Sequence, residues 1–245
     1  MIIKYIILIC LFLLIFYLHK KYIIETFETN KSNDIPKILH LIWIGTKKAP
    51  ENILTWTNNF QKANPDWTVK VWGNKEIDEL KLVNKKQFDA MKEYCGKADI
   101  ARYEIVYRYG GMYIDADTLW LENPIKPNFL KGSINFFYEK ENLIANGWFV
   151  ANRNHPFLKL VIDEIPKRDM NKPAWKSVGP QLITDVYNKL QNKETYDIQF
   201  VDIKDVLCPT SWHGINNEKY KTLLEQCKKE KRALAFHYGI STNNL

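Results

Sequence analysis

The chain has 245 residues, 46% of them hydrophobic and 26% charged, with a formal net charge of +7. This composition is typical of a globular protein and excludes a disordered or collagen-like chain. The basic residues are scattered, with no arginine-rich stripe and no zinc-finger spacing, so we expect no nucleic-acid partner. The four cysteines form no CxxC pair, which argues against a structural zinc site and leaves one disulfide open.

The first segment is apolar over residues 2–18, except for Lys4, and is long enough to cross a bilayer. Its flank contains no small-x-small cleavage site, so we predict an uncleaved membrane anchor over residues 1–21. Residues 22–34 are predicted to form a polar stem that carries the possible glycosylation sequon Asn30-Lys31-Ser32. The expectation is a single-pass protein of the Golgi or ER, type II, although the flanking charges leave its side open.

From residue 35 onward, strand and helix patterns alternate. Strands are predicted at 37–44, 67–72, 112–114, 134–138, 148–151, 198–201 and 233–236. Helices are predicted at 50–62, 75–82, 86–95, 98–109, 156–165, 180–190 and 218–229. Gly110 and Gly111 are expected to end the helix at 98–109. The alternation predicts one layered α/β domain over residues 35–245.

Two carboxylates, Asp115 and Asp117, follow the predicted strand 112–114. Ligands in open α/β sheets collect at the carboxyl ends of strands, and paired carboxylates suit Mg²⁺ or Mn²⁺ that also contacts substrate phosphates. A D-x-D triplet is common, however, and its alternative interpretation is a solvated turn. Asp99 and Arg102 lie three residues apart and share a helix face, either as a surface ion pair or facing the site.

The stretch at 98–120, ADIARYEIVYRYGGMYIDADTLW, resembles the signature of glycosyltransferases that carry a DXD sugar-binding region. That family includes fungal α-1,6-mannosyltransferases, α-1,4-galactosyltransferases and inositol-phosphoceramide mannosyltransferases. Further similar blocks are IPKILHLIWIG at 35–45, NPDW at 64–67, VW at 71–72, the stretch from Gly147 to NHPF at 154–157, and SVGP at 177–180. The resemblance extends to about residue 237. It implies a GT-A fold, a divalent metal (Mn²⁺ or Mg²⁺) and retention of anomeric configuration.

The resemblance also implies roles for particular residues. Asp115 and Asp117 would bind metal and donor, and His237 would be a third metal ligand, although the tryptophan expected after it is absent. Arg102 would add positive charge beside the leaving diphosphate. The catalytic residues would therefore be Asp115, Asp117 and Arg102.

The substrate would be held by a wider set. Asp99, Arg102 and Tyr113 resemble the residues that hold the donor sugar. Trp43 would contact the nucleotide base or pack in the core, and Trp212 would close over the donor or lie in an exposed loop. Gly179 and Asn146 are assigned to the acceptor side.

The prediction is a hexosyltransferase that uses a UDP- or GDP-sugar and an acceptor hydroxyl on a glycan, glycolipid or protein. One alternative is a DxD metal phosphohydrolase, for which the sequence lacks the additional ligands of two-metal sites. Another is a membrane-tethered carbohydrate- or lipid-binding protein with an inactive transferase domain. The intact Asp99, Arg102, Asp115 and Asp117 argue against the latter.

Overall fold

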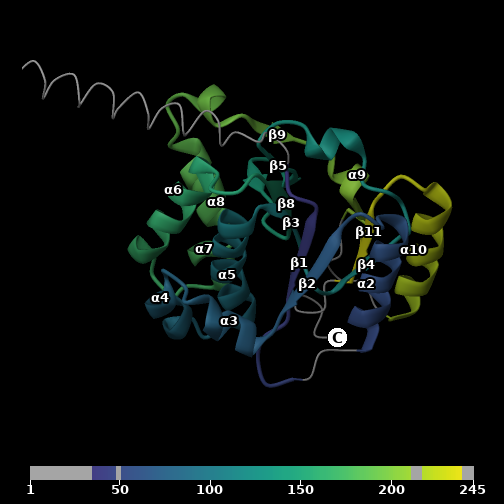
Figure 1. Cartoon of the computed structure of the whole chain (residues 1–245), viewed down its shortest axis with the longest axis horizontal. Coiled ribbons are helices and arrows are strands. Elements are labelled where there is room, and N and C mark those ends of the chain that lie inside the picture. The colour runs from purple at the N-terminus through teal and green to yellow at the C-terminus, as the bar shows by residue number, and fades with distance from the viewer. Residues whose placement is uncertain (1–34, 48–50, 211–216, 239–245) are drawn as a thin grey trace, which may run out of the picture. The chain divides into compact units, whose positions relative to one another are not determined.

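The computed structural model describes residues 35–47, 51–210 and 217–238 (Figure 1). These residues belong to one compact unit, Asp34–Leu245. The predicted anchor and stem at 1–34 lie outside the described residues, as does Trp212. Within the three described ranges, no helix combines the length and hydropathy needed to span a bilayer.

A six-stranded sheet forms the centre of the domain, in the order β2-β1-β3-β8-β5-β9. Its strands are β1 (Ile38–Ile42), β2 (Thr68–Trp72), β3 (Gly111–Ile114), β5 (Ile134–Phe136), β8 (Trp148–Ala151) and β9 (Ile198–Phe200). β1 runs parallel to β2 and β3, whereas β8 is antiparallel to β3, with Ile114 opposite Trp148. The carboxyl end of β3 and the amino end of β8 therefore lie at the same edge of the sheet.

Two smaller sheets complete the strands. One has the order β10-β11-β4 and comprises β4 (Thr118–Trp120), β10 (Leu207–Cys208) and β11 (Ala235–His237). The other pairs β6 (Tyr138–Lys140) with β7 (Leu143–Ile144). The predicted strand 134–138 is therefore wrong as a single element, because β5 ends at Phe136 and β6 belongs to a different sheet.

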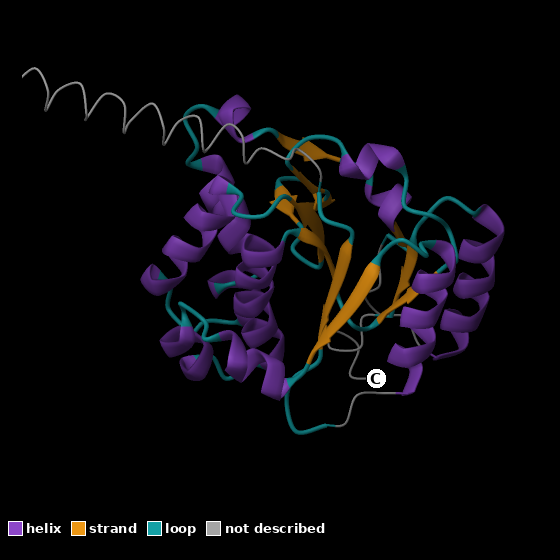
Figure 2. Ribbon diagram, viewed as in Figure 1, coloured by secondary structure: helices purple, strands orange, loops and turns teal. Residues whose placement is uncertain are grey.

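Helices lie on both sides of the strands (Figure 2). One group comprises α3 (Asn74–Leu80), α4 (Lys85–Ala90), α5 (Tyr94–Tyr109), α6 (Pro156–Glu164), α7 (Ala174–Ser177) and α8 (Pro180–Asn188). The other comprises α2 (Glu51–Ala63) and α10 (Asn217–Glu230), and the short helix α9 (Ile203–Val206) precedes β10. Each side has its own core: Ile100, Tyr103 and Phe149 belong to the first, and Phe60 and Trp148 to the second. The expected layered α/β arrangement is confirmed.

The helix predicted at 86–95 is wrong at its end. α4 stops at Ala90, Met91 adopts an extended conformation, and α5 begins at Tyr94, four residues before the predicted start at 98. Met91 is only 1% exposed, and a Cβ added at Gly96 would lie 2.8 Å from its sulfur. The chain turns here because burial of Met91 against α5 outweighs the helical pattern of residues 86–95.

The glycine pair after α5 connects the helix directly to β3. The amide of Gly110 donates to the carbonyl of Val106, so the helix ends at the glycine pair as expected. Both glycines have positive φ. A Cβ at Gly111 would lie 2.4 Å from the carbonyl oxygen of Ile38, so this position requires glycine. The turn thus places the residues of α5 beside those that follow β3.

Two buried histidines are held in their neutral form. His40 donates from Nε2 to the carbonyl of Gly110 (2.9 Å) and accepts from Trp72 Nε1 (3.2 Å). His155 caps α6, because its Nδ1 accepts from the amide of Phe157 (3.2 Å). Burial lowers the pKa of each histidine to about 4. Protonation would remove the Nδ1 acceptor of each histidine. Both side chains are therefore favoured as the neutral tautomer that carries its proton on Nε2.

We expect the domain to lose stability as the pH falls from 6.5 toward 4. In this window each unfolded histidine binds a proton that the folded one does not, so acid favours unfolding. His155→Asn keeps a helix-capping side chain but cannot titrate. Urea unfolding at pH 6.5 and 5 should show a loss about 1.5 kcal/mol smaller in this variant than in the natural chain. An unchanged pH dependence would contradict the assignment.

Candidate active site

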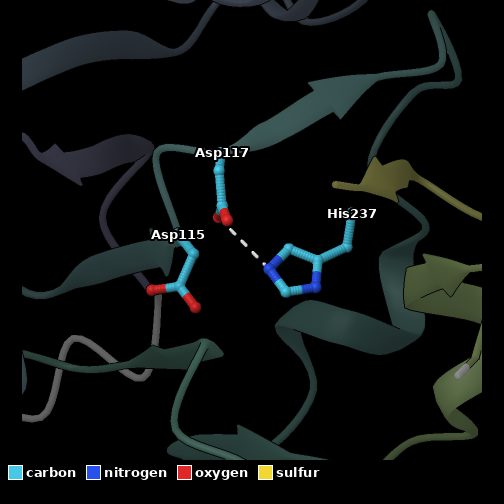
Figure 3. A group of neighbouring side chains, drawn as sticks. All are labelled: Asp115, Asp117 and His237. Atoms are coloured by element: carbon cyan, nitrogen blue, oxygen red, sulfur yellow. Dashed lines mark hydrogen bonds and ion pairs between the residues drawn. The ribbon is translucent and has the colours of Figure 1, made fainter. Parts of the chain in front are cut away.

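The turn between β3 and β4 carries Asp115-Ala116-Asp117 (Figure 3). The amide of Asp115 donates to the carbonyl of Gly147 (2.9 Å), which ties the turn to the residue before β8. The register of β4 with β11 sets Thr118 opposite His237, and the amide of Tyr238 donates to the backbone carbonyl of Asp117 (3.1 Å). Backbone pairing therefore brings the end of β11 to a turn 120 residues earlier in the sequence.

Asp115, Asp117 and His237 form a group that could hold a metal ion. One ligand atom of each lies within 4.8 Å of the others, and His237 Nε2 lies 3.1 Å from Asp117 Oδ1 (Figure 3). Within the described ranges, this is the one such group. Two carboxylates and an imidazole fit a divalent cation such as Mn²⁺.

The electrostatics of His237 suit this role. Burial lowers the pKa of its imidazole, but the charge and hydrogen bond of Asp117, together with the charges of Asp115 and Glu139, outweigh burial and raise the pKa. The carboxylates therefore give this group of side chains a net attraction for positive charge. A metal cation bound in place of the imidazole proton would balance the negative charge of the same carboxylates.

Behind this group lies a buried ion-pair network. Arg102 Nη2 lies 2.9 Å from Asp99 Oδ1 and 3.1 Å from Asp115 Oδ1, and Nη1 donates to the carbonyl of Asn146 (2.8 Å). Its guanidinium also lies 4.4 Å from the ring centroid of Tyr113. Asp99 is 6% and Arg102 4% exposed, so the surface ion-pair interpretation is wrong. Arg102 holds two carboxylates in fixed positions.

The network shifts the pKa values of its members. Burial raises the pKa of Asp99 to about 6, partly offset by Arg102. Burial opposes the charge of Arg102, but Asp115, Tyr113 and Asp99 outweigh it and raise the pKa of its guanidinium. Arg102 therefore remains a cation, and its charge is shared between the DXD turn and α5.

Asn146 joins this network to the other side of the site. Its Nδ2 donates to Asp99 Oδ1 (2.8 Å) and to the hydroxyl of Tyr103 (3.0 Å), which in turn donates to the carbonyl of Val178 (3.0 Å). The sequence analysis missed Tyr103, because a tyrosine at a buried helical position gives the pattern of a core residue. Its position directly after Arg102 in the sequence was the one indication that Tyr103 lies near the site.

The remaining candidates are distributed around this centre. Tyr113 donates from its hydroxyl to Asp115 Oδ1 (2.9 Å). A Cβ at Gly179 would lie 3.1 Å from Asp99 Oδ2, so Gly179 adjoins the network. Trp43 is partly buried, packs at the edge of the α2-side core and donates from Nε1 to the carbonyl of Lys47 (3.0 Å). These contacts agree with the second interpretation of Trp43, which is packing in the core.

Gly147 is expected to be essential for the geometry of the DXD turn. A Cβ added there would lie 2.6 Å from Asp115 Oδ2, which is too close to be accommodated without moving the carboxylate. Gly147→Ala should weaken Mn²⁺ binding about tenfold or more while the midpoint of thermal unfolding changes little. Calorimetric titration with Mn²⁺ measures the first and circular dichroism the second. Unchanged Mn²⁺ affinity would show that Asp115 tolerates the displacement.

Comparison with known proteins adds independent support. Residues 50–137 match the family model of the glycosyltransferase sugar-binding region containing the DXD motif. The chain is 29% identical over 200 residues to the uncharacterized glycosyltransferase L373 of Acanthamoeba polyphaga mimivirus, covering 76% of this chain and 78% of the relative. It is 27% identical over 152 residues to inositol phosphoceramide mannosyltransferase 1 of Schizosaccharomyces pombe, covering 58% of this chain and 46% of that protein. The chain thus spans about half the length of this yeast relative.

Solved structures of glycosyltransferases share the fold. PaToxG glycosyltransferase superposes with a TM-score of 0.50 at 18% identity, over 89% of this chain and 98% of that one. The ligand-free glycosyltransferase domain of the YGT toxin gives a TM-score of 0.51 at 10% identity, over 69% and 80%. The mixed α/β architecture is therefore GT-A-like.

Fold, site and family match together define the class of protein as a sugar-transferring enzyme. More narrowly, residues 50–137 match the sugar-binding region with the DXD motif that is found in glycosyltransferases.

Proposed function

We propose that this glycosyltransferase moves a hexose from a UDP- or GDP-sugar to an acceptor hydroxyl, with retention of anomeric configuration and with Mn²⁺ or Mg²⁺. One observation carries the proposal: Arg102 joins the buried ion pair to the candidate metal group of Asp115, Asp117 and His237. Its guanidinium contacts Asp99 on one side and Asp115 on the other. A diphosphate site and a sugar site are thereby connected by one side chain.

Each residue has a distinct part in this scheme. Asp115, Asp117 and His237 would hold the divalent cation, which supplies positive charge to the leaving diphosphate. Tyr113 and Arg102 orient Asp115 through Oδ1. Arg102 also contributes its own charge, and because it is fixed by three partners it needs little reorganisation during transfer.

Asp99 would bind a hydroxyl of the donor sugar. Its Oδ1 is occupied by Arg102 and Asn146, whereas its Oδ2 lies on the side of Gly179. Asn146 thereby sets the direction of the second oxygen of Asp99, and Tyr103 accepts a hydrogen bond from the Asn146 amide. The acceptor would approach over Gly179.

The names of relatives support a glycolipid among the possible acceptors, which otherwise include other glycans and proteins. The yeast relative is named for inositol phosphoceramide. A rat protein, lactosylceramide 4-alpha-galactosyltransferase, is 32% identical over 93 residues, which is 38% of this chain and 24% of that protein. Both names describe a ceramide-based acceptor, which a membrane-attached enzyme would reach readily.

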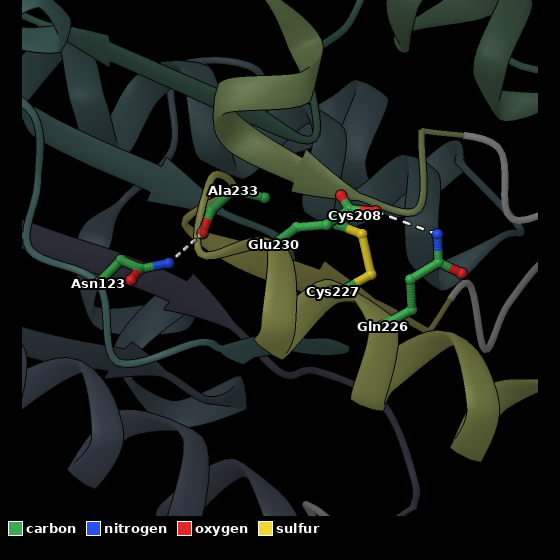
Figure 4. Close-up of a disulfide and its surroundings, with 6 residues drawn as sticks. All are labelled: Asn123, Cys208, Gln226, Cys227, Glu230 and Ala233. Carbon is green, nitrogen blue, oxygen red and sulfur yellow. Dashed lines mark hydrogen bonds between the residues drawn. A yellow bond between two sulfur atoms is a disulfide. The ribbon is translucent and has the colours of Figure 1, made fainter.

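The proposed domain organisation is an anchor at 1–21, a stem at 22–34 and a catalytic domain at 35–245. A disulfide between Cys208 and Cys227 joins β10 to α10 (Figure 4), while Cys95 is exposed as a free thiol. Disulfides persist mainly in oxidising compartments. This supports a type II orientation with the catalytic domain in the lumen of the Golgi or ER. Loss of the Asn30 glycan in Asn30→Gln, seen as a shift in electrophoretic mobility, would support it, and a catalytic domain open to protease in sealed vesicles would oppose it.

Transfer is distinguished from hydrolysis by following the sugar. The full-length chain would be incubated with Mn²⁺, a labelled UDP- or GDP-hexose, and lactosylceramide or lactose as the acceptor. We expect label on the acceptor in an α linkage, seen in the proton coupling of the new anomeric centre. Label released only as free sugar would indicate hydrolysis of the bond at the anomeric carbon. Label released as sugar 1-phosphate would instead favour a metal phosphohydrolase.

A further inference from the structure

Trp175 is a large, exposed aromatic residue on a segment whose backbone lies close to the buried network. It lies in α7 and is 48% exposed, although tryptophan is highly buried on average. A Cβ added at Gly179 would lie 2.7 Å from the Cα of Trp175 and 3.1 Å from Asp99 Oδ2. The backbone of Trp175 and the carboxylate of Asp99 therefore meet across Gly179.

The segment that carries Trp175 is fixed at both ends. The amide of Ala174 donates to Glu93 Oε1 (2.8 Å), and the amide of Gly179 donates to the carbonyl of Ala174 (2.9 Å). A Cβ at Gly96 would lie 2.8 Å from that of Ala174, so α7 packs tightly against α5. An aromatic ring on such a fixed segment can bind a ligand with little loss of backbone entropy.

Position along the site distinguishes the acceptor from the donor. Arg102 lies between Asp99 and Asp115, so the candidate metal group is on one side of Asp99. Gly179 lies on the side of the other oxygen of Asp99, Oδ2, and the backbone of Trp175 lies next to Gly179. A ligand over Trp175 would therefore lie beyond the sugar held by Asp99, away from the diphosphate.

We propose that Trp175 forms an acceptor subsite in which its indole ring stacks on the apolar face of a pyranose. The proposal rests on the proposed function, because it requires a donor sugar at Asp99. One face of a pyranose carries mainly C–H groups, which pack well on the electron-rich face of an aromatic ring. Lys176 Nζ, 5.0 Å from the same ring centroid, is placed to donate to hydroxyls of that sugar.

The test measures acceptor and donor separately in the full-length chain. Initial rates with Mn²⁺ would be followed with lactose and methyl α-D-mannopyranoside as acceptors, and binding of both sugars in the presence of UDP or GDP by saturation-transfer NMR. Trp175→Ala should raise the acceptor KM roughly tenfold and abolish the NMR contact, with the donor KM retained. Trp175→Phe should restore most of the acceptor affinity. Leu160→Ala, 38% exposed on α6, is the control and should change neither constant.

Several results would overturn this subsite. They are an unchanged acceptor KM in Trp175→Ala, a rise confined to the donor KM, and failure of the natural chain to bind either sugar. The proposed function itself fails in a different way, through absence of any metal-dependent turnover of the donor in the natural chain. Normal transfer that is insensitive to Trp175 would contradict the subsite alone.

Discussion

Asp117→Ala should reduce sugar transfer on the order of a thousandfold while the domain remains folded. Asp117 offers a carboxylate to the candidate metal group and lies 3.1 Å from His237, so its removal takes away a ligand and the partner that orients the imidazole. Loss of a single preorganised charge at a reacting centre typically has an effect of about this size. Initial-rate measurements give the activity, and Mn²⁺ titration by calorimetry gives the accompanying loss of affinity.

The matched control is Asp163→Ala. Asp163 is also an aspartate in an ion pair, with Lys159, but it lies exposed on α6. Its removal should leave both activity and Mn²⁺ affinity unchanged, since exposed pairs contribute little. If Asp117→Ala retained Mn²⁺ affinity and activity within a few fold, the assignment of the DXD turn as the metal site would be wrong.

Arg102→Ala should have the largest effect on stability. The substitution leaves Asp99 without its cation in a site where the carboxylate is 6% exposed, and it removes the donor that holds the carbonyl of Asn146. Breaking a buried pair by removing one partner typically costs about 3–5 kcal/mol. Urea unfolding at pH 7 should show a decrease of this size in the free energy of unfolding.

Arg232→Ala is the corresponding change at the surface. Arg232 contacts Asp202 and Asp205, but its side chain is 45% exposed, so its removal should change the free energy of unfolding far less than that of Arg102. In addition, Asp99→Asn combined with Arg102→Ala should recover part of the stability, because the uncompensated charge is then absent. Equal losses in Arg102→Ala and Arg232→Ala would show that the network contributes little to folding.

The centre of the candidate site was predicted from the resemblance of residues 98–120 to glycosyltransferases with the DXD motif, and its residues are close along the chain. Asp99, Arg102, Asp115 and Asp117 lie within one helix–turn–strand unit, and the glycine pair indicated where the helix ends. The strands of the central sheet were also predictable, since each is a short apolar run. Local pattern is sufficient where the contacts are local.

Features that depend on distant pairing could not be obtained in the same way. β4 has only three residues, so its antiparallel register with β11 leaves no periodic signal. His237 was expected beside Asp117 from the resemblance alone, and this register is what brings it there. The disulfide partners Cys208 and Cys227 were not distinguishable from Cys95 by spacing. The end of α4 depends on burial of Met91 against α5, a tertiary contact that overrides helical propensity.

Nucleotide release from a panel of UDP- and GDP-sugars tests the central claim most directly. The full-length chain would be assayed with Mn²⁺, with and without EDTA, and donor binding would be measured in parallel by calorimetry. We expect release from a particular donor that requires the metal, stops with EDTA and is lost in Asp117→Ala. Donor turnover that continues in EDTA, or the absence of both turnover and metal-dependent binding for every donor, would contradict the account.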